Sequence, residues 1–327
     1  MSSVLITGVD GQLGTYLSKI YLSNGDKVFG ISRKTGLNKD INYLNCNINN
    51  KDNVDNIIAS NKFNYIYNLA ADSSVSLSWK KPQETLNNNI LPVLNILEAI
   101  KNHSPNSKFF QASSSEIFGN NFDKTMVNEN SALSPNSPYG ISKASSHMLV
   151  KLYRDSFDIY ACCGILYASE SPLRDKKFVT KKIISKLVEI KNDNNGTLSL
   201  GNILLPRDWS FAGDSAQIMS MILKNKTPDD FIIASGNQYS IKDFINEACN
   251  ILDMPIYWMG NGINLKALCS KTERVIVSIS PEFFRPNEKA PSIPDISKLD
   301  GYFNERSKTS FKEIVDILIN NEMALNK

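Results

Sequence analysis

Histidine is scarce in this sequence, which has only His103 and His147 among its 327 residues. A Ser-His-Asp triad and a histidine-rich metal site both depend on imidazole groups, so this scarcity argues against triad chemistry, and we predict no metal site. His103 lies in the polar segment KNHSPNS, and His147 lies four residues after Lys143 in a predicted helix. We expect a structural or solvent-exposed role for both histidines.

Cysteine is also limited, and its spacing matches neither a redox motif nor a zinc site. The five cysteines are Cys46, Cys162, Cys163, Cys249 and Cys269. None of them belongs to a CxxC pair, and an odd, scattered set is typical of reduced thiols in a cytoplasm. We therefore expect a cytoplasmic protein in which the cysteines are structural.

Long apolar runs and an excess of one charge are missing as well. No run approaches the roughly 20 apolar residues of a membrane helix, and MSSVLITG lacks the basic start of a signal peptide. The 36 basic and 33 acidic residues give a net charge of +3, which offers no reason to expect a nucleic-acid or membrane partner. At this length, with 42% hydrophobic residues, the chain can form one large α/β domain and a smaller lobe.

Apolar patterns along the first half alternate between strand and helix. The expected strands are 3–8, 27–32, 41–47, 65–71, 108–114 and 159–167. The expected helices are 13–25, 53–61, 87–102 and 138–157. This alternation predicts an α/β fold with a doubly wound parallel sheet. After residue 165 the rhythm loosens, and 176–191 reads as a basic amphipathic helix.

We predict two interleaved domains on this basis. The first is a dinucleotide-binding domain over residues 1–165, with returns near 208–238 and 283–298. The second is a smaller substrate-binding lobe within residues 166–327.

A glycine-rich segment, ITGVDGQLG, joins the first predicted strand to the first predicted helix. Its glycines, Gly8, Gly11 and Gly14, let a backbone approach a pyrophosphate at a helix N-terminus. An NAD site usually has an acidic residue after the second strand to hold the ribose hydroxyls. Here Ser32 holds that position and Arg33 and Lys34 follow, so the sequence favours NADP, whose 2′-phosphate suits two cations.

Two further segments carry candidate catalytic groups. In SPYGISK, Tyr139 and Lys143 lie four residues apart and share one helix face, where an ammonium lowers the pKa of a phenol. About one YxxxK match is expected by chance in a chain of this composition. The match supports a catalytic role only because it lies downstream of a dinucleotide-binding motif and shortly after the serine-rich strand end. In QASSSEIFG, Glu116 follows three serines at the carboxyl end of a predicted strand, where α/β enzymes place their chemistry.

Together these motifs resemble the extended short-chain dehydrogenases/reductases. The matching features are TGxxGxxG, NLAA at 68–71, the serine-rich strand end and YxxxK. Beyond them, QASSSEIFG, GILYASESPLRDKKFVTKKI, LGN with RDWSFAGD, and FFRPNE resemble the GDP-mannose 4,6-dehydratases over essentially the whole chain. The resemblance implies a Rossmann fold with a C-terminal substrate lobe, a bound NADP that is recycled, a GDP-linked sugar as substrate, and a homodimer or homotetramer.

The resemblance also implies roles for individual residues. Ser114 would hold the sugar C4 oxygen, Tyr139 would be the base at C4, Lys143 would tune Tyr139, and Glu116 would be the base at C5. The implied cofactor-binding residues are Gly8, Gly11, Gln12, Leu13, Gly14, Arg33, Asn47, Ile48, Leu69, Ala70, Ala71, Tyr139 and Lys143. The implied substrate-binding residues are Ser74, Val179, Lys182 or a neighbour, Arg207, Arg285 and Glu288.

This chain departs from the dehydratase pattern in the sugar-binding segments, which leaves alternatives open. Asp72 and Ser74 stand where the dehydratases have Gln and His, and Ala168 and Ser169 stand where they have Asn and His. SSVSLSW and SPYGISKAS are closer to the related GDP-4-dehydro-6-deoxymannose reductases. A dehydratase is therefore the first hypothesis, and an NADPH-dependent reductase or epimerase of a GDP-linked keto-sugar is the second. A non-catalytic nucleotide-sugar-binding protein is the third.

Overall fold

The chain divides into two compact units, each built from separate stretches of sequence. The computed structural model describes residues 1–33, 38–119, 126–193, 195–284, 292–306 and 308–326. Unit 1 consists of Met1–Tyr167, Ala212–Gly236 and Ser292–Ser307. Unit 2 consists of Ala168–Phe211, Asn237–Pro291 and Lys308–Lys327. Which unit binds the cofactor and which binds the substrate stays a prediction.

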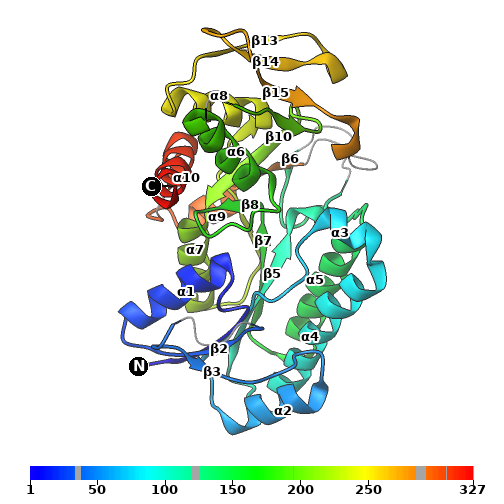
Figure 1. Ribbon diagram of the computed structural model, residues 1–327. Coiled ribbons are helices and arrows are strands. Elements are labelled where there is room, and N and C mark those ends of the chain that lie inside the picture. The colour runs from blue at the N-terminus through cyan, green and yellow to red at the C-terminus, as the bar shows by residue number, and fades with distance from the viewer. Residues whose placement is uncertain (34–37, 120–125, 194, 285–291, 307, 327) are drawn as a thin grey trace. The chain divides into compact units, whose positions relative to one another are not determined.

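Unit 1 is built on a seven-stranded parallel sheet with the order β11-β7-β5-β4-β1-β2-β3 (Figure 1). Its strands are β1 (Ser3–Thr7), β2 (Lys27–Ile31), β3 (Asn42–Tyr43), β4 (Tyr65–Asn68), β5 (Lys108–Ser114), β7 (Ala161–Leu166) and β11 (Phe231–Ile233). The strand order reverses between β1 and β4. The carboxyl ends of these two strands therefore form the switch point at which open α/β sheets bind their ligands.

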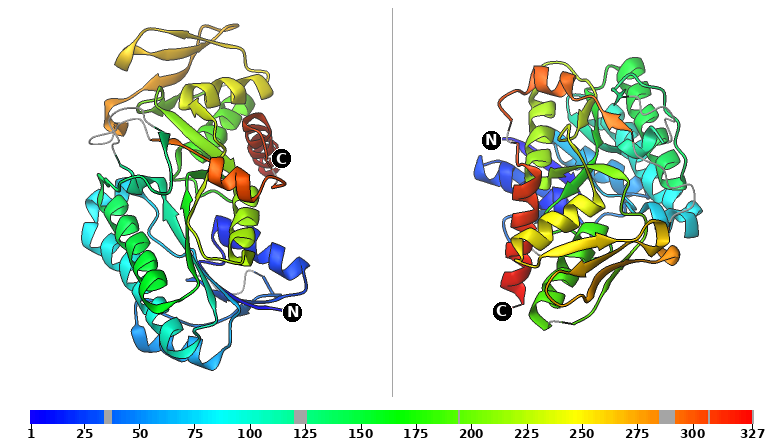
Figure 2. Two further views of the ribbon diagram at one scale, coloured as in Figure 1. Left: turned by 180° about the vertical axis from the view of Figure 1, so that it is seen from behind. Right: turned by 90° about the horizontal axis from the view of Figure 1, so that it is seen from above.

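Helices cover both faces of this sheet (Figures 1 and 2). On one face lie α1 (Gln12–Ser23) and α7 (Ala212–Lys224), and on the other lie α2 (Lys51–Ser60), α4 (Pro82–His103) and α5 (Pro138–Phe157). Successive side chains of a strand point to opposite faces of the sheet, so both faces present apolar residues that helices can cover. In β1, Val4 and Ile6 pack on the α1–α7 side, and Leu5 packs on the α2–α4–α5 side. The predicted doubly wound parallel sheet is confirmed.

Some predicted elements in unit 1 have different bounds. Helix α4 begins at Pro82 rather than at residue 87, because a proline fits the first turn of a helix, where its missing N–H costs nothing. The strand expected over 41–47 is only β3, Asn42–Tyr43. Unit 1 also contains α3 (Val75–Lys80), the short helix η1 (Ser115–Ile117), α9 (Ser297–Tyr302), and the two-stranded sheet of β6 (Met126–Val127) and β16 (Ile293–Pro294).

Unit 2 contains two small sheets and three helices. One sheet has the order β12-β10-β8 and the other has the order β13-β14-β15-β9. Their strands are β8 (Ala168–Glu170), β9 (Leu198–Leu200), β10 (Pro206–Phe211), β12 (Gln238–Ser240), β13 (Ile256–Met259), β14 (Lys266–Cys269) and β15 (Val275–Ile279). The helices are α6 (Val179–Asp193), α8 (Ile241–Ile251) and α10 (Phe311–Leu325), with short turns η2 (Gly262–Asn264) and η3 (Pro281–Phe283).

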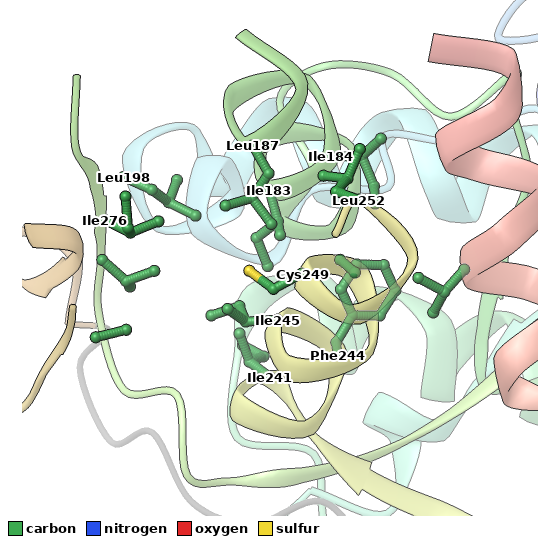
Figure 3. Close-up of a cluster of buried hydrophobic side chains, with 14 of the residues drawn as sticks. Ile183, Ile184, Leu187, Leu198, Ile241, Phe244, Ile245, Cys249, Leu252 and Ile276 are labelled. Carbon is green, nitrogen blue, oxygen red and sulfur yellow. The ribbon is translucent and has the colours of Figure 1, made fainter. Parts of the chain in front are cut away.

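A separate hydrophobic core holds unit 2 together (Figure 3). Ile183 and Leu187 of α6 pack with Phe244 and Ile245 of α8, and Leu198 of β9 closes the cluster. The predicted helix at 176–191 corresponds to α6, whose apolar face supplies this core.

The stretch 208–238, which we predicted as a return of the chain to the first domain, contains Ala212–Gly236 of unit 1. Residues 208–211 belong to β10, which pairs with β8 and β12, so hydrogen bonding assigns them to unit 2. The second return begins at Ser292 rather than at residue 283. Among the described residues, no helix is long and apolar enough to cross a membrane.

A buried ion pair ties α5 to the sheet of unit 1. Arg154 Nη1 and Nη2 donate to the two carboxylate oxygens of Asp230, each at 2.8 Å, and the backbone N–H of Cys163 donates to Asp230 Oδ1 at 2.6 Å. Burial alone would raise the pKa of Asp230, but the hydrogen bonds from Arg154 and from the Cys163 N–H outweigh it and lower that pKa. The charged form of Asp230 therefore stabilises the native state.

Replacing Asp230 tests this ion pair. Asp230→Asn removes the bidentate carboxylate partner of the buried Arg154 guanidinium, so we expect the free energy of unfolding to fall by about 3–5 kcal/mol at neutral pH. Because the folded pKa is lowered, the contribution is present above the unfolded pKa of about 3.9 and is lost as the pH falls below it. Urea denaturation at several pH values measures both effects.

Glu84→Gln is the control for the Asp230 variant. Glu84 pairs with Lys81 at 2.9 Å on the exposed surface at the start of α4, and exposed pairs contribute only about 0–1 kcal/mol. A loss at Asp230→Asn no larger than that at Glu84→Gln would contradict the assignment.

Candidate active site

The glycine turn between β1 and α1 forms a close backbone cradle. Gly8 has a φ of +69° and donates its N–H to the Ile31 carbonyl at 2.7 Å. A Cβ on Gly8 would lie 3.0 Å from the Ala70 nitrogen, and one on Gly14 would lie 2.4 Å from the Gly8 carbonyl oxygen. Side chains are excluded at both positions, so backbone N–H groups at the start of α1 can face a pyrophosphate. The structure thus fits a dinucleotide phosphate at this turn.

Two of the remaining predicted cofactor residues of this turn begin α1. The helix starts at Gln12, and Leu13 packs against the hydrophobic cluster shared by α1 and α7. The other predicted positions follow neighbouring strands: Asn47 and Ile48 come after β3, and Leu69, Ala70 and Ala71 come after β4. All of these segments therefore meet at the carboxyl edge of one parallel sheet.

The end of β2 carries an exposed cation and lacks an acidic residue of its own. Arg33 is exposed two residues after β2, and Lys34 lies outside the described residues. A carboxylate nevertheless reaches this region from the glycine turn, because Asp10 Oδ1 accepts a 2.6 Å hydrogen bond from the Tyr43 hydroxyl. The sequence analysis missed Asp10, which carries no motif signal beyond its place between two glycines.

A buried ladder of hydrogen bonds crosses the same edge of the sheet. Thr7 Oγ1 donates to Asn68 Oδ1 at 2.6 Å, and Asn68 Nδ2 donates to Gln111 Oε1 at 2.8 Å. Gln111 Nε2 and Lys143 Nζ both donate to the Ala112 carbonyl, at 2.9 and 2.8 Å. The ladder links β1, β4, β5 and α5, and its polar side chains read as ordinary strand residues in the sequence.

Tyr139 and Lys143 share the buried face of α5, as their spacing predicts. The Lys143 ammonium lies 5.8 Å from the centre of the Tyr139 ring. Burial lowers the pKa of Lys143 to about 8, which the nearby Cys163 opposes. This lysine is thus a cation that responds to small electrostatic changes near neutral pH.

Ser114 and Glu116 lie beside these residues at the end of β5. Ser114 is the last residue of the strand, and its Oγ accepts a 3.3 Å bond from the N–H of Glu116, the second residue of η1. A Cβ on Gly140 would lie 2.7 Å from the Glu116 carbonyl oxygen, so the first turn of α5 packs directly on this segment. The structure therefore brings Ser114, Glu116, Tyr139 and Lys143 together within unit 1.

His147 forms a Ser-His-Asp arrangement that does not resemble a hydrolytic site. His147 Nδ1 is hydrogen bonded to Ser113 Oγ at 3.2 Å, and Nε2 lies 3.7 Å from Asp230 Oδ2. Only 3% of the Ser113 surface is exposed, and Arg154 already occupies the Asp230 carboxylate. Burial lowers the pKa of His147 and keeps it neutral, so the group is a structural link between α5 and β5. His103 is exposed at the end of α4.

Predicted substrate-binding residues are found in both units. Ser74 Oγ accepts from the Leu77 N–H and caps α3 in unit 1. In unit 2, Val179 begins α6, and Lys182 Nζ donates to the Ser199 carbonyl at 2.9 Å and lies 4.0 Å from the centre of the Phe283 ring. Its neighbour Lys181 instead forms a buried 2.6 Å pair with Glu322.

The remaining substrate predictions concern three charged residues. Arg207 lies on β10, opposite Tyr239 of β12. Arg285 and Glu288 lie outside the described residues. Within the described part of the chain, no group of three His, Cys, Asp or Glu side chains could hold a metal ion.

Several solved structures share the fold of this chain. A UDP-glucose 4-epimerase with UDP-glucose from Thermotoga maritima is 18% identical, with a TM-score of 0.83 over 99% of this chain and 100% of that one. A dTDP-glucose 4,6-dehydratase from Bacillus anthracis in complex with NAD is 17% identical, with a TM-score of 0.80 over 98% and 96%. RMD from Pseudomonas aeruginosa, complexed with NADPH, is 15% identical, with a TM-score of 0.80 over 99% and 100%. At these identities the likeness concerns the fold, which is that of the extended short-chain dehydrogenases/reductases.

Comparison of the sequence with known proteins identifies a family within this class. A family model described as GDP-mannose 4,6 dehydratase matches residues 5–318. GDP-mannose 4,6-dehydratase from Vibrio cholerae is 33% identical over 90% of this chain and 86% of the relative. GDP-mannose 4,6 dehydratase from Drosophila melanogaster is 33% identical over 98% and 86%. The chain belongs to the GDP-mannose 4,6-dehydratase family, which confirms the resemblance found in the sequence.

The buried ladder can be tested by removing its central side chain. Asn68→Leu keeps the approximate volume but leaves Thr7 and Gln111 without their partner, so each unpaired group should cost about 1–3 kcal/mol of the free energy of unfolding. Asn49→Leu is the control, because Asn49 makes one exposed 2.9 Å bond to Asn88 and should change stability by no more than about 0.5 kcal/mol. Equal stabilities of the two variants in urea denaturation would show that the ladder contributes little.

Proposed function

We propose that the protein is a nucleotide-sugar 4,6-dehydratase that converts GDP-mannose or a close GDP-hexose to the GDP-4-dehydro-6-deoxy sugar. The observation that carries the proposal is the grouping of Ser114, Glu116, Tyr139 and Lys143 in unit 1 of a chain from this family. Three of these residues serve oxidation at C4, and Glu116 adds the base that elimination requires.

The proposed reaction is redox-neutral. The C4 hydroxyl loses its proton and the C4 carbon loses a hydride, so that C4 becomes a ketone and the C5 proton becomes acidic. Loss of the C5 proton and of the C6 hydroxyl releases water and leaves a C5–C6 double bond. Return of the hydride to C6 and of a proton to C5 completes the product. When bound, the nicotinamide cofactor supplies the hydride acceptor and donor, so no net reductant is consumed.

Tyr139 and Lys143 perform the proton chemistry at C4 in this proposal. The buried ammonium of Lys143 favours the phenolate of Tyr139, which then removes the proton of the C4 hydroxyl. The Ala112 carbonyl accepts from Lys143 Nζ at 2.8 Å and fixes the direction of that ammonium. Ser114 would donate to the C4 oxygen from the end of β5.

Glu116 is the residue that separates dehydration from simple reduction. Its backbone follows directly after β5 and contacts the first turn of α5, beside Tyr139. A carboxylate beside the C4 oxidation site is suited to remove the C5 proton once C4 is a ketone. A reductase of a keto-sugar needs no such base.

NADP is the cofactor that we propose. The glycine cradle fits a pyrophosphate, and two structures with this fold are described with NAD and NADPH. Arg33 after β2 provides an exposed guanidinium suited to a 2′-phosphate. The residues proposed at this site are those named above along the carboxyl edge of the sheet.

For the substrate, we propose that unit 2 binds the GDP moiety. Arg207 and Arg285 would hold the diphosphate, Val179 and Lys182 would contact the guanosine, and Glu288 would hold its ribose hydroxyls. Burial lowers the pKa of Lys182, and the nearby Glu282 opposes this shift. Ser74 of unit 1 would meet the sugar.

A reductase or epimerase of a GDP-linked keto-sugar remains the second candidate. Ala168 and Ser169, which replace the Asn and His of the dehydratase pattern, lie on β8 and pair with Trp209 and Ser210 of β10. These smaller side chains alter the polar groups that this segment can offer to a sugar.

We also propose a homodimer or homotetramer. The exposed side chains of Ile141, Met148 and Leu152 lie at spacings of seven and four along α5, which places them on one stripe. An apolar stripe of this kind suits a second copy of the chain. Sedimentation of the full chain as a monomer at all concentrations would contradict this proposal.

Turnover without added reductant tests the dehydratase proposal directly. We expect the purified protein with a catalytic amount of NADP to convert GDP-mannose to a product that has lost one water, as seen by mass spectrometry. Consumption of NADPH in stoichiometric amounts with a keto-sugar, and no water loss from GDP-mannose, would favour the reductase instead.

Glu116→Gln separates the two half-reactions. The variant keeps shape and hydrogen bonding but lacks the base, so dehydration should slow about 10²–10⁴-fold while oxidation at C4 still produces the absorbance of reduced nicotinamide. Exchange of the C5 proton with solvent deuterium should stop. Tyr139→Phe is the matched comparison, because it should abolish the reduced-nicotinamide signal itself. Turnover of Glu116→Gln near the wild-type rate would remove Glu116 from the mechanism.

Arg33→Ala tests the cofactor assignment. Wild-type protein should bind NADP more tightly than NAD, and the variant should lose most of that preference, since a hydrogen bond to a charged group contributes about 1.5–3 kcal/mol. Isothermal titration calorimetry measures both affinities. Equal affinities in the wild type would argue against a phosphate clamp at Arg33.

A further inference from the structure

The second strand of unit 1 lacks the acidic residue that normally follows it in a dinucleotide-binding sheet. In such folds an Asp or Glu at this position accepts hydrogen bonds from the hydroxyls of the adenosine ribose. Here Ser32 and Arg33 follow β2. The ribose end of the site therefore has to obtain any carboxylate from another element.

Asp10 supplies a carboxylate to this position from the glycine turn. Strand β2 lies between β1 and β3, with Ile31 opposite Thr7 and Gly30 opposite Tyr43. The 2.6 Å bond from the Tyr43 hydroxyl to Asp10 Oδ1 joins the turn after β1 to β3. It must therefore cross the carboxyl end of β2, so the Asp10 carboxylate lies where the missing acid would stand.

The second oxygen of this carboxylate is available for a ligand. Asp10 Oδ2 is buried and has no hydrogen-bond partner among the described residues. Buried polar atoms are nearly always paired, because leaving one unpaired costs free energy. An acceptor held at the ribose end of a dinucleotide site is completed by a hydroxyl donor.

We propose that Asp10 reads the 2′ position of the adenosine ribose and sets the cofactor preference against Arg33. This rests on the proposed binding of a nicotinamide dinucleotide to the glycine turn. A free 2′-hydroxyl, as in NAD, donates to Asp10 Oδ2. A 2′-phosphate, as in NADP, places a second negative group beside the same carboxylate and must be offset by a cation such as Arg33. The preference for NADP is therefore smaller than Arg33 alone would produce.

Tyr43 is a positioning residue in this proposal. Its hydroxyl donates to Asp10 and accepts a 3.3 Å bond from the Asn38 N–H, so it connects the segment before β3 to the glycine turn. If Asp10 served only to hold this loop, its loss would lower the affinities for NAD and NADP equally. If Asp10 reads the 2′ position, its loss changes the two affinities in opposite directions.

Calorimetric titration of the full chain with NAD and with NADP, without sugar, distinguishes these cases. Asp10→Asn keeps the shape and removes the charge, and we expect NAD to bind about fivefold to tenfold more weakly, the difference between a charged and a neutral hydrogen bond. NADP should bind severalfold more tightly. Tyr43→Phe keeps the Asp10 carboxylate but removes the hydrogen bond that orients it. The affinity for NAD should therefore fall less than in Asp10→Asn.

Asp40→Asn is the matched control, because it removes the same charge from an exposed position between β2 and β3. Both affinities should stay within about twofold of the wild type, since exposed charges are screened by salt. Equal weakening of both cofactors in Asp10→Asn, or no change in either, overturns the proposal. If the wild type binds neither dinucleotide, the cofactor part of the proposed function fails instead. Dehydratase activity does not enter the measurement.

Discussion

The hydrogen bond from Asn68 Nδ2 to Gln111 Oε1 is the contact on which the arrangement of unit 1 most depends. It is 2.8 Å long and buried, and it joins β4 to β5, while Thr7 of β1 bonds to the same Asn68 side chain. Through the Ala112 carbonyl it also reaches Lys143. Buried amides of this kind must be paired, so the strands keep one register and the carboxyl edge keeps one shape. The glycine turn and the Tyr139–Lys143 face are thus held by the same network.

The charged side chains of α5 and their partners lie in different surroundings along the helix. Burial lowers the pKa of Lys143 to about 8, and its ammonium donates to the neutral Ala112 carbonyl. Asp230, by contrast, pairs with Arg154 near the C-terminal end of α5, and the hydrogen bonds from Arg154 outweigh burial and lower the pKa of Asp230. Neutral His147 lies between the two ends of the helix and bonds to Ser113. A buried lysine with a lowered pKa and a buried ion pair therefore lie on the same helix.

Much of the fold could be predicted from the sequence because its signals are local. The alternation of apolar residues predicts strands and helices, and the glycine spacing predicts the β1–α1 turn. Glu116, Tyr139 and Lys143 could be named because each sits in a short motif whose spacing requires a strand end or one helix face. Domain limits were less accurate, since β10 belongs to unit 2 by pairing with strands that lie about 30 to 40 residues away in sequence.

The sequence by itself determined the fold class, the family and the short motifs, because these depend on residues within a few positions of one another. Only the tertiary structure decided which distant polar groups meet. Asn68 and Gln111 are 43 residues apart, Asp10 and Tyr43 are 33 apart, and Lys181 and Glu322 are 141 apart. Such pairs depend on strand order, register and helix packing, which no local pattern encodes. For that reason Asp10 looked like a turn residue in the sequence, and in the fold it stands where β2 lacks its acid.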